Sequence, residues 1–218
     1  MSPHPRYAEF IELLEREDRG RSIAFCQRLL AEGTVDLPTL YTEFLATSLN
    51  RMECDADEAT CIWREHVRSS IIRSIIETCY PSVLKERDAR FGPGPVGKAL
   101  VVCPVDELHE LGARMVTDFF TMAGFDSIFV GANTPMGVIE SAVRAVKPAV
   151  VAISVTNYYH LFAAEKIVST LKALDTVKRF KVVVGGRAFE EHPDALRQVG
   201  ADALLEGLDD IIALRKGV

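Results

Sequence analysis

The sequence predicts an α/β protein, with a five-stranded, parallel, doubly wound sheet preceded by a four-helix bundle. Up to about residue 80 the apolar residues recur at helical spacings of three and four. From residue 98 onwards, short β-branched runs alternate with amphipathic stretches. The glycine- and proline-rich segment DARFGPGPVG separates the two patterns. We therefore expect a helical bundle at 1–87, a linker at 88–97 and a sheet domain at 98–218.

The N-terminal half has the pattern of four amphipathic helices joined by short breaks, which is typical of a small antiparallel bundle. Representative apolar positions are Phe10, Leu13 and Leu14 in the first helix, Ile23, Cys26, Leu29 and Leu30 in the second, Leu40, Phe44, Leu45 and Leu49 in the third, and Ile62, Val67, Ile71, Ile72, Ile75 and Ile76 in the fourth. We expect Asp36 to cap the third helix ahead of Pro38. Pro81 is expected to end the fourth.

In the C-terminal half, strand and helix patterns alternate strictly. The expected strands are 99–103, 127–130, 149–154, 181–184 and 203–205, and the expected helices are about 108–123, 135–146, 158–174, 192–199 and 208–216. Such alternation requires a parallel sheet with helices on both faces. Five strands in a segment of this length fit the flavodoxin-like order 2-1-3-4-5.

Composition excludes several classes of function. The chain has 218 residues, 48% of them hydrophobic, and a net charge of −6. It lacks the basic surplus of a direct nucleic-acid binder. No apolar run approaches the roughly 20 residues that cross a membrane, and the N-terminus lacks a secretion-signal pattern. The five cysteines are odd in number and include no Cys-x-x-Cys pair. We therefore expect a cytoplasmic protein with reduced, mostly buried thiols.

Unusual residues collect at one edge of the predicted sheet. In parallel sheets of this order, ligands bind outside the carboxyl ends of the strands, where strands 1 and 3 diverge. The residues expected there are Glu107, His109 and Gly112 after strand 1, Ser154 and Thr156 after strand 3, and Gly185 and Gly186 after strand 4. Three loops that are distant in the sequence therefore converge on one candidate site.

The loop after strand 1 disfavours common ligands of this fold class. Binding a dinucleotide needs Gly-x-Gly-x-x-Gly there, so that the pyrophosphate approaches the helix N-terminus. This loop carries a carboxylate and an imidazole instead, and no Walker phosphate loop is present. A phosphoacceptor receiver domain would end strand 3 in aspartate, where this chain has Ser154. All three alternatives are disfavoured.

A histidine flanked by carboxylates suits metal coordination. A carboxylate that binds one ring N–H of His109 would set its tautomer and raise its basicity. Because only one such histidine is present, a protein-only zinc site is disfavoured, and the metal would arrive with most of its ligands attached. The alternatives are a solvent-exposed His109 at a helix start and a glycine pair that serves only a turn.

Together these residues resemble the cobalamin-binding domain, whose hallmark is Asp-x-His-x-x-Gly, then Ser-x-Leu, then Gly-Gly. This chain has Glu107-Leu-His109-Glu-Leu-Gly112, then Ser154-Val-Thr156, then Gly185-Gly186, in the same order and strand positions. The preceding four-helix bundle resembles the cap of corrinoid proteins. The resemblance therefore covers nearly the whole chain.

The resemblance implies roles for these residues. His109 would replace dimethylbenzimidazole as the lower axial ligand of cobalt, with Glu107 as its hydrogen-bond partner. Ser154 and Thr156 would line the slot for the displaced nucleotide tail. Gly185 and Gly186 would leave room for that tail. His160, after strand 3, has two open interpretations: a group that faces the corrin and an ordinary surface histidine.

The departures from the hallmark, Glu107 for Asp and Thr156 for Leu, look more like the sensory, regulator-linked branch. Glu65 and His66 resemble a Glu-His pair in the helical domain of light-sensing, adenosylcobalamin-dependent repressors. Those repressors carry a Trp ten residues before the Glu, and a His directly after that Trp. This chain has Asp55 and Ala56 at these two positions. Trp63 lies near the pair but out of register, so it either covers the upper face or packs in the bundle.

Three functions follow as hypotheses. The first is a non-enzymatic cobalamin sensor that binds adenosylcobalamin or another alkylcobalamin and signals to a partner protein or to its own oligomer. It would contact neither nucleic acid nor membrane directly. The second is a corrinoid methyl-carrier subunit of a methyltransferase system, although such carriers usually have Asp in the first motif. The third is an interaction module with a decayed site, which the presence of His109 and the glycine pair argues against.

Overall fold

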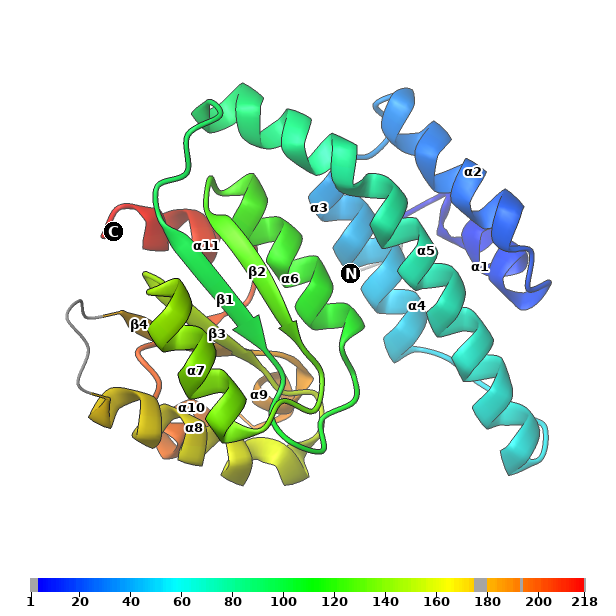
Figure 1. Cartoon of the computed structure of the whole chain (residues 1–218). Helices are drawn as coiled ribbons and strands as arrows, with labels where there is room; N and C mark the ends of the chain where they lie inside the picture. The colour runs from blue at the N-terminus through cyan, green and yellow to red at the C-terminus, as the bar shows by residue number, and fades with distance from the viewer. Residues whose placement is uncertain (1–3, 175–179, 193, 218) are drawn as a thin grey trace. The chain divides into compact units, whose positions relative to one another are not determined.

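The computed structural model describes residues 4–174, 180–192 and 194–217. Its chain divides into two compact units, Met1–Val83 and Leu84–Val218, which we describe separately (Figure 1). The first unit is helical and the second contains the whole sheet. No helix in the described ranges combines the length and apolar character needed to cross a membrane.

The first unit contains the expected four helical stretches. They are α1 (Tyr7–Glu15), α2 (Arg19–Ala31), the continuous run of α3 (Leu37–Thr39), the π-helix η1 (Leu40–Ala46) and α4 (Thr47–Asn50), and then α5 (Glu58–Phe91). Asp36 caps α3 by accepting a 2.9 Å hydrogen bond from the Thr39 backbone N–H, which confirms the predicted cap. Phe10 lies at the centre of the core, stacked on Phe25 and edge-on to Phe44.

Helix α5 corrects one expectation. Pro81 lies inside this helix, which continues to Phe91, so residues 88–91 of the expected linker are helical. The apolar stripe of α5 reaches Val83, which is fully buried, and its packing outweighs the hydrogen bond that proline removes. The boundary between the two compact units, after Val83, therefore falls within a helix.

The cysteines correct a second expectation. Cys54 and Cys61 form a disulfide, whereas all five cysteines were expected to be reduced. Two cysteines seven positions apart match no disulfide pattern that the sequence alone would reveal. They meet because the loop after α4 folds back onto the first turns of α5. Cys26, Cys79 and Cys103 are buried thiols, as expected. Burial raises the pKa of Cys103 to about 12, with Glu107 and Glu110 adding to the shift, so this thiol is inert.

The second unit is a five-stranded parallel sheet in the predicted order β2-β1-β3-β4-β5. Its strands are β1 (Lys98–Val102), β2 (Asp126–Gly131), β3 (Val150–Ser154), β4 (Lys181–Gly185) and β5 (Ala203–Leu205). Its helices are α6 (Leu111–Met122), α7 (Met136–Val146), the 3₁₀ turn η2 (Tyr158–His160), α8 (Leu161–Ala173), α9 (Arg187–Glu191), α10 (Ala195–Val199) and α11 (Leu208–Arg215). The short helix α9 was not expected, and residue 193 of the expected helix 192–199 lies outside the described residues.

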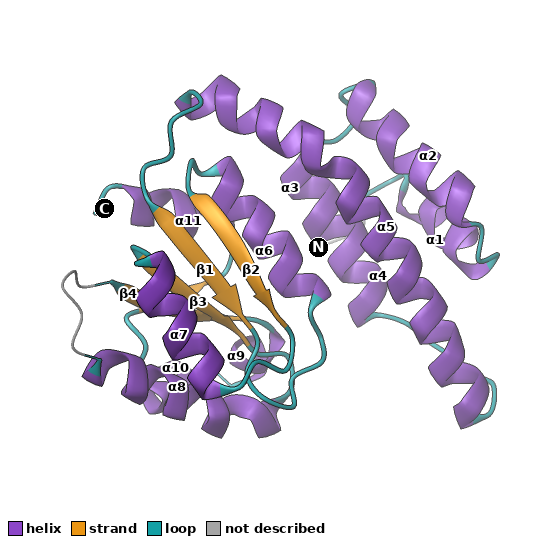
Figure 2. Cartoon of the chain, in the orientation of Figure 1, coloured by secondary structure: helices purple, strands orange, loops and turns teal. Residues whose placement is uncertain are grey.

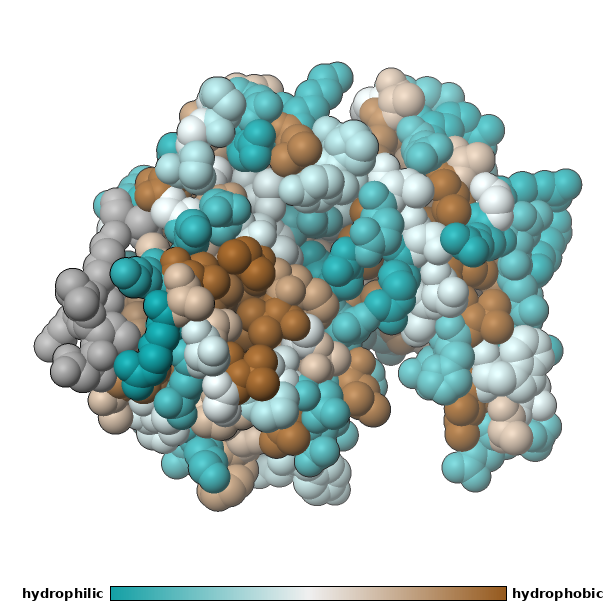
Figure 3. Space-filling model, viewed as in Figure 1, coloured by the Kyte–Doolittle hydropathy of each residue, from teal (hydrophilic) through white to brown (hydrophobic). Residues whose placement is uncertain are grey.

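Helices cover both faces of the sheet, as the alternating pattern requires (Figure 2). One face packs against α7, α8, α9 and α10 through a core of β-branched and aliphatic residues. Helix α11 packs against α6. Strand β2 is an edge strand whose apolar residues stay half-buried, and hydrophobic residues gather over this edge and part of α7 (Figure 3).

Asp202 joins α8 to the sheet and makes stability depend on pH. Its carboxylate accepts hydrogen bonds from the Val182 N–H and the Lys172 ammonium, both at 2.7 Å. Burial raises the pKa of Asp202, but these two hydrogen bonds outweigh it, and the net pKa lies below its ordinary value. Ionised Asp202 therefore adds stability above the unfolded-state pKa of about 3.9, and this is lost as pH falls through the lower folded-state pKa.

Asp202→Asn should lower the free energy of unfolding at pH 7 by about 1 kcal/mol, a modest amount because the carboxylate is partly exposed. The difference from wild type should begin to shrink as pH falls below about 4, where the carboxylate of the unfolded chain protonates, and should continue to shrink through the lower folded-state pKa. Thermal melts at pH 7, 5 and 3.5 measure it. A difference that grows towards low pH would contradict this account.

Candidate functional site

The loop after β1 turns Glu107 into the protein. Asp106 has a left-handed backbone (φ 67°), and its N–H donates to the Asn133 side chain at 2.9 Å. The Asn133 N–H in turn donates to the Glu107 carbonyl, also at 2.9 Å. These contacts tie the loop after β1 to the loop after β2. As a result Glu107 is fully buried between the exposed neighbours Asp106 and Leu108.

The Glu107 carboxylate accepts five hydrogen bonds from two loops. Oε1 accepts from the His109 backbone N–H at 3.1 Å and from His109 Nδ1 at 2.7 Å. Oε2 accepts from the backbone N–H groups of Thr156 at 2.8 Å and Asn157 at 3.0 Å. His160 Nδ1 lies 3.0 Å from the same oxygen. Loops after β1 and β3, about 50 residues apart in sequence, thus meet at one carboxylate.

These donors keep Glu107 ionised. Burial raises its pKa, but the hydrogen bonds from His109, His160 and the backbone of Asn157 and Thr156 outweigh burial and lower the pKa far below its ordinary value. An ionised carboxylate only accepts hydrogen bonds. His109 and His160 therefore both present Nδ1–H to Glu107, which makes Nε2 the lone-pair nitrogen in each neutral ring.

The structure brings most of the predicted site residues to one sheet edge. The His109 side chain is 57% exposed and lies just before α6. Ser154 pairs with Gly185 at the ends of β3 and β4, and Thr156 follows β3. Gly112 lies in the first turn of α6, where an added Cβ would meet nothing within 4 Å, so open space adjoins this residue.

Sequence reasoning did not place His160 or Asn133 beside Glu107. His160 belongs to the 3₁₀ turn η2, which Asn157 caps through the Tyr159 N–H. The signal available for His160 was a histidine just after a strand that ends at the ligand edge. The idea that His160 faces a corrin stays a prediction, because its measured contact is with Glu107.

The glycine pair has a packing reason within the chain. An added Cβ at Gly185 would lie 2.9 Å from the Leu205 carbonyl oxygen. At Gly186, which has φ 107°, an added Cβ would lie 2.4 Å from the Val155 carbonyl oxygen. Both glycines thus allow close approach of neighbouring backbone. Room for a nucleotide tail beside them stays a prediction.

Gly186→Ala should therefore destabilise the protein by about 2–4 kcal/mol, through both the backbone conformation and the contact with Val155. Gly137→Ala in α7, where the added Cβ meets nothing within 4 Å, is the matched control and should be neutral or slightly stabilising. Urea unfolding of both variants measures the effect. Equal stability of the two variants would contradict the proposed packing role.

Exposed apolar side chains flank the Glu107 cluster. They come from the loop after β1 and from the turn and helix after β3, and they are Val105, Leu108, Tyr158, Tyr159 and Phe162. Tyr159 and Phe162 are 84% and 73% exposed. Apolar groups gathered in this way mark a surface that receives a ligand or partner.

Trp63, Glu65 and His66 belong to the helical unit and are exposed on α5. Trp63 is 44% exposed, with the Arg64 guanidinium 5.7 Å from its ring centroid. More than half of the Trp63 surface is therefore covered by the chain, and the rest is open to solvent. A contact of these residues with a cofactor stays a prediction.

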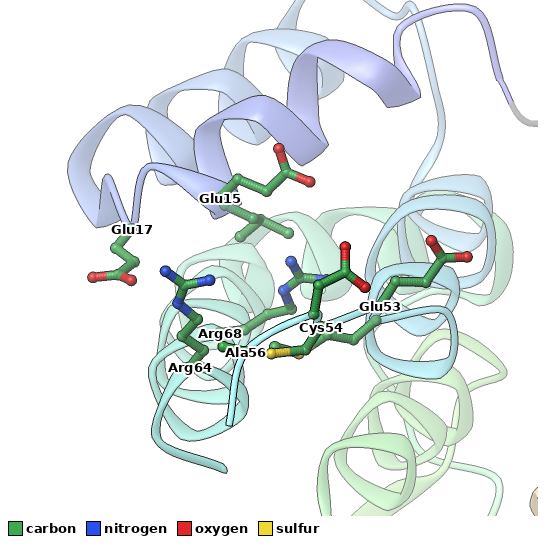
Figure 4. A pocket seen from close by; sticks show the side chains of 10 residues that line it. Glu15, Glu17, Glu53, Cys54, Ala56, Arg64 and Arg68 are labelled. Atoms are coloured by element: carbon green, nitrogen blue, oxygen red, sulfur yellow. The ribbon is translucent and has the colours of Figure 1, made fainter. Parts of the chain in front are cut away.

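The helical unit also contains a pocket of about 510 Å³. It lies between the end of α1, the loop after α4 and α5, and Arg64 and Arg68 extend into it near acidic side chains (Figure 4). Cys54, Asp55 and Ala56 line one wall. Asp55 and Ala56 stand at the two positions where the resemblance to the light-sensing repressors would have placed Trp and His.

The fold and the site together define a class of protein. It is a parallel α/β domain in which a buried carboxylate holds an imidazole at the edge of the sheet. The described residues contain no group of three or more side chains that would hold a metal ion by themselves. The donor set therefore fits a cofactor that brings a metal with most of its ligands in place.

Comparison with known proteins gives the family. The B12 binding domain matches residues 97–213. The chain is 30% identical to the HTH-type transcriptional repressor CarA of Myxococcus xanthus, over 84% of this chain and 59% of the repressor. It is 27% identical to the trimethylamine corrinoid protein of Methanosarcina barkeri, over 49% of this chain and 48% of that protein. The chain thus spans about half to three-fifths of these relatives.

A solved structure shares the fold. The monomethylamine corrinoid protein of Methanosarcina barkeri superposes with a TM-score of 0.75 over 94% of each chain, at 18% identity. This chain belongs to the B12 binding domain family, and its cofactor is cobalamin. The predicted fold and cofactor are confirmed.

Proposed function

We propose that this chain is a cobalamin-binding sensory protein in which His109 is the lower axial ligand of cobalt. The observation that carries the proposal is the buried Glu107 carboxylate, 2.7 Å from Nδ1 of a half-exposed imidazole. Because Nδ1 carries the proton, Nε2 is the nitrogen for cobalt. Bound cobalamin supplies a cobalt–carbon bond, which is where covalent chemistry occurs.

Glu107 orients His109 and raises its basicity. The Thr156 and Asn157 backbone N–H groups hold the second carboxylate oxygen, so the imidazole keeps one orientation. Around this pair, the proposed slot for the nucleotide tail is lined by Gly112, Ser154, Thr156, Gly185 and Gly186. The open space at Gly112 and the partial exposure of Ser154 and Thr156 support the slot.

The helical unit would cover the upper face of the cofactor through Trp63, Glu65 and His66. All three side chains are exposed on α5 and are therefore available to a ligand. Their presence favours adenosylcobalamin or another alkylcobalamin that acts as a signal over methylcobalamin that acts as a methyl carrier. Aspartate and alanine at positions 55 and 56 mean that any light response would use different contacts from those of the light-sensing repressors.

The similarity to the repressor supports a sensory function because it extends over 84% of this chain, beyond the B12 binding domain itself. Loss of the upper ligand would change the contacts of Trp63, Glu65 and His66, and that difference would bias two conformations. A partner protein or a second copy of the chain would receive the signal. The chain itself would perform no catalysis.

The second candidate is a corrinoid methyl carrier for a methyltransferase. The 27% identity to a trimethylamine corrinoid protein over half of this chain favours it. A carrier would exchange methyl groups with a partner enzyme and would have no need of an upper-face Glu-His pair.

An assembly assay on the chain loaded with adenosylcobalamin and a methyl-transfer assay on the chain loaded with methylcobalamin separate the candidates. Size-exclusion chromatography in the dark and after green light should show a light-dependent change of oligomeric state if the chain is a light sensor. A change in affinity for an added partner protein would support the sensor equally. Unchanged assembly, together with demethylation of the methylcobalamin-loaded chain by a methyltransferase, would contradict the sensor and establish the carrier.

A further inference from the structure

The Cys54–Cys61 disulfide lies where the helical unit begins the segment that carries Trp63, Glu65 and His66. Cys54 belongs to the loop after α4, and Cys61 lies near the start of α5. Both are partly exposed, unlike the three buried thiols. A reductant therefore reaches this pair more readily than it reaches any other cysteine of the chain.

The fold does not depend on this disulfide. The core of the helical unit is built from aromatic and aliphatic residues of α1, α2, η1 and the middle of α5, from Ile71 onwards. The start of α5 is also held by Asp57, which accepts hydrogen bonds from the Thr60 N–H at 3.1 Å and the Thr60 hydroxyl at 2.8 Å. Opening the disulfide would therefore loosen a local segment and leave the bundle folded.

The disulfide determines how far that local segment can move. It joins the loop that lines the Arg64–Arg68 pocket to the helix turn from which Arg64 extends (Figure 4). Residues 52–56 lie between α4 and α5 and belong to no helix or strand. Without the S–S bond, the contacts that remain between the loop and α5 are local ones: the Asp57 cap, the hydrogen bond from the Cys61 N–H to the Asp57 carbonyl, and the approach of Cys61 Sγ to the Ala56 carbonyl.

We infer that Cys54 and Cys61 form a redox switch that controls the order of the 51–66 segment. In the oxidised form the loop is tied to α5, and Trp63, Glu65 and His66 are held on a rigid helix turn. A dithiol reductant transfers two electrons and two protons: one thiolate attacks a disulfide sulfur, its second thiol resolves the mixed disulfide, and the reductant leaves as a disulfide. The reduced form has two thiols and a freer segment.

The charges around the pair select the reductant. Glu15, Glu17, Glu53 and Asp55 outnumber Arg64 and Arg68 in the pocket lining, so the surroundings are net negative. Negative surroundings slow attack by an anionic small thiol such as glutathione. A protein dithiol, whose attacking group is carried on a complementary surface, fits the switch better.

The effect of the switch on cobalamin binding rests on the proposed function. The loosening of residues 51–66 on reduction does not. The first experiment uses the full chain without cobalamin, oxidised and then reduced with dithiothreitol. Amide hydrogen exchange in residues 51–66 should become at least about tenfold faster on reduction, while exchange in α2 stays unchanged. The Cys54→Ser/Cys61→Ser variant should match the reduced chain under both conditions, and Cys26→Ser should still switch.

The second experiment loads the same proteins with adenosylcobalamin and measures its dissociation rate in the dark. We expect cobalamin to leave the reduced chain and the double variant faster than it leaves the oxidised chain. Re-oxidation of the reduced wild-type chain should restore the slow release. Equal hydrogen exchange in oxidised and reduced chains would overturn the switch. Changed exchange with equal release would overturn its link to the cofactor, and a wild-type chain that takes up no cobalamin would instead contradict the proposed function.

Discussion

His109→Ala is expected to shift bound cobalamin to a base-off absorption spectrum without unfolding the chain. The imidazole is more than half exposed and lies outside the core, so its removal leaves packing intact. Loss of the axial nitrogen should also weaken cobalamin binding by at least about 10-fold, because losing even a hydrogen-bond partner of a metal ligand costs about 10- to 100-fold. Absorption spectra and thermal melts of the loaded and unloaded variant measure both effects.

His4→Ala is the matched control, because His4 lies in the helical unit and contacts Phe44. It should leave the spectrum of bound cobalamin unchanged. If His109→Ala also kept the wild-type spectrum, the assignment of the lower ligand would be wrong. Exogenous imidazole should restore a base-on spectrum to His109→Ala, since the carboxylate partner Glu107 remains in place.

Glu107→Gln is expected to lower the free energy of unfolding of the chain without cobalamin by about 2–4 kcal/mol. The buried carboxylate accepts five hydrogen bonds, and glutamine would replace one acceptor oxygen by an NH₂ group that faces other donors. Buried N–H groups left without an acceptor account for the cost. Urea unfolding of the unloaded chain measures it.

The control for this variant is Glu190→Gln, the same chemical change on an exposed side chain of α9. It should alter the free energy of unfolding by less than about 0.5 kcal/mol. Equal stability of Glu107→Gln and wild type would mean that the five hydrogen bonds are not needed to hold the two loops together. The loaded Glu107→Gln variant should in addition show a weakened His109–cobalt bond.

Much of the fold was predictable because the sequence patterns are local and strong. Short apolar runs, most of them rich in β-branched residues, predicted all five strands, and their strict alternation with helices predicted a parallel sheet. The order β2-β1-β3-β4-β5 was predicted because five strands in a segment of this length fit the flavodoxin-like order. Two features depended on tertiary contacts and were missed. Burial of Val83 carries α5 past Pro81, and a folded-back loop pairs Cys54 with Cys61.

The site was partly predictable for a similar reason. The resemblance to the cobalamin-binding domain predicted the hydrogen bond between Glu107 and His109, and the two residues lie two positions apart in one loop. The contact of His160 with Glu107 spans 53 residues, so only the assembled sheet edge reveals it. The glycine pair was predicted as part of the site, but its packing against Leu205 and Val155 needed the backbone geometry.

The central claim is that this sheet edge holds cobalamin through His109. The most direct measurement is the absorption spectrum of the purified chain after incubation with adenosylcobalamin in the dark and desalting. The account predicts about one retained cobalamin per chain, with the spectrum of a histidine-bound cobalt that His109→Ala abolishes. A chain that emerges colourless, whichever cobalamin is supplied, would contradict it.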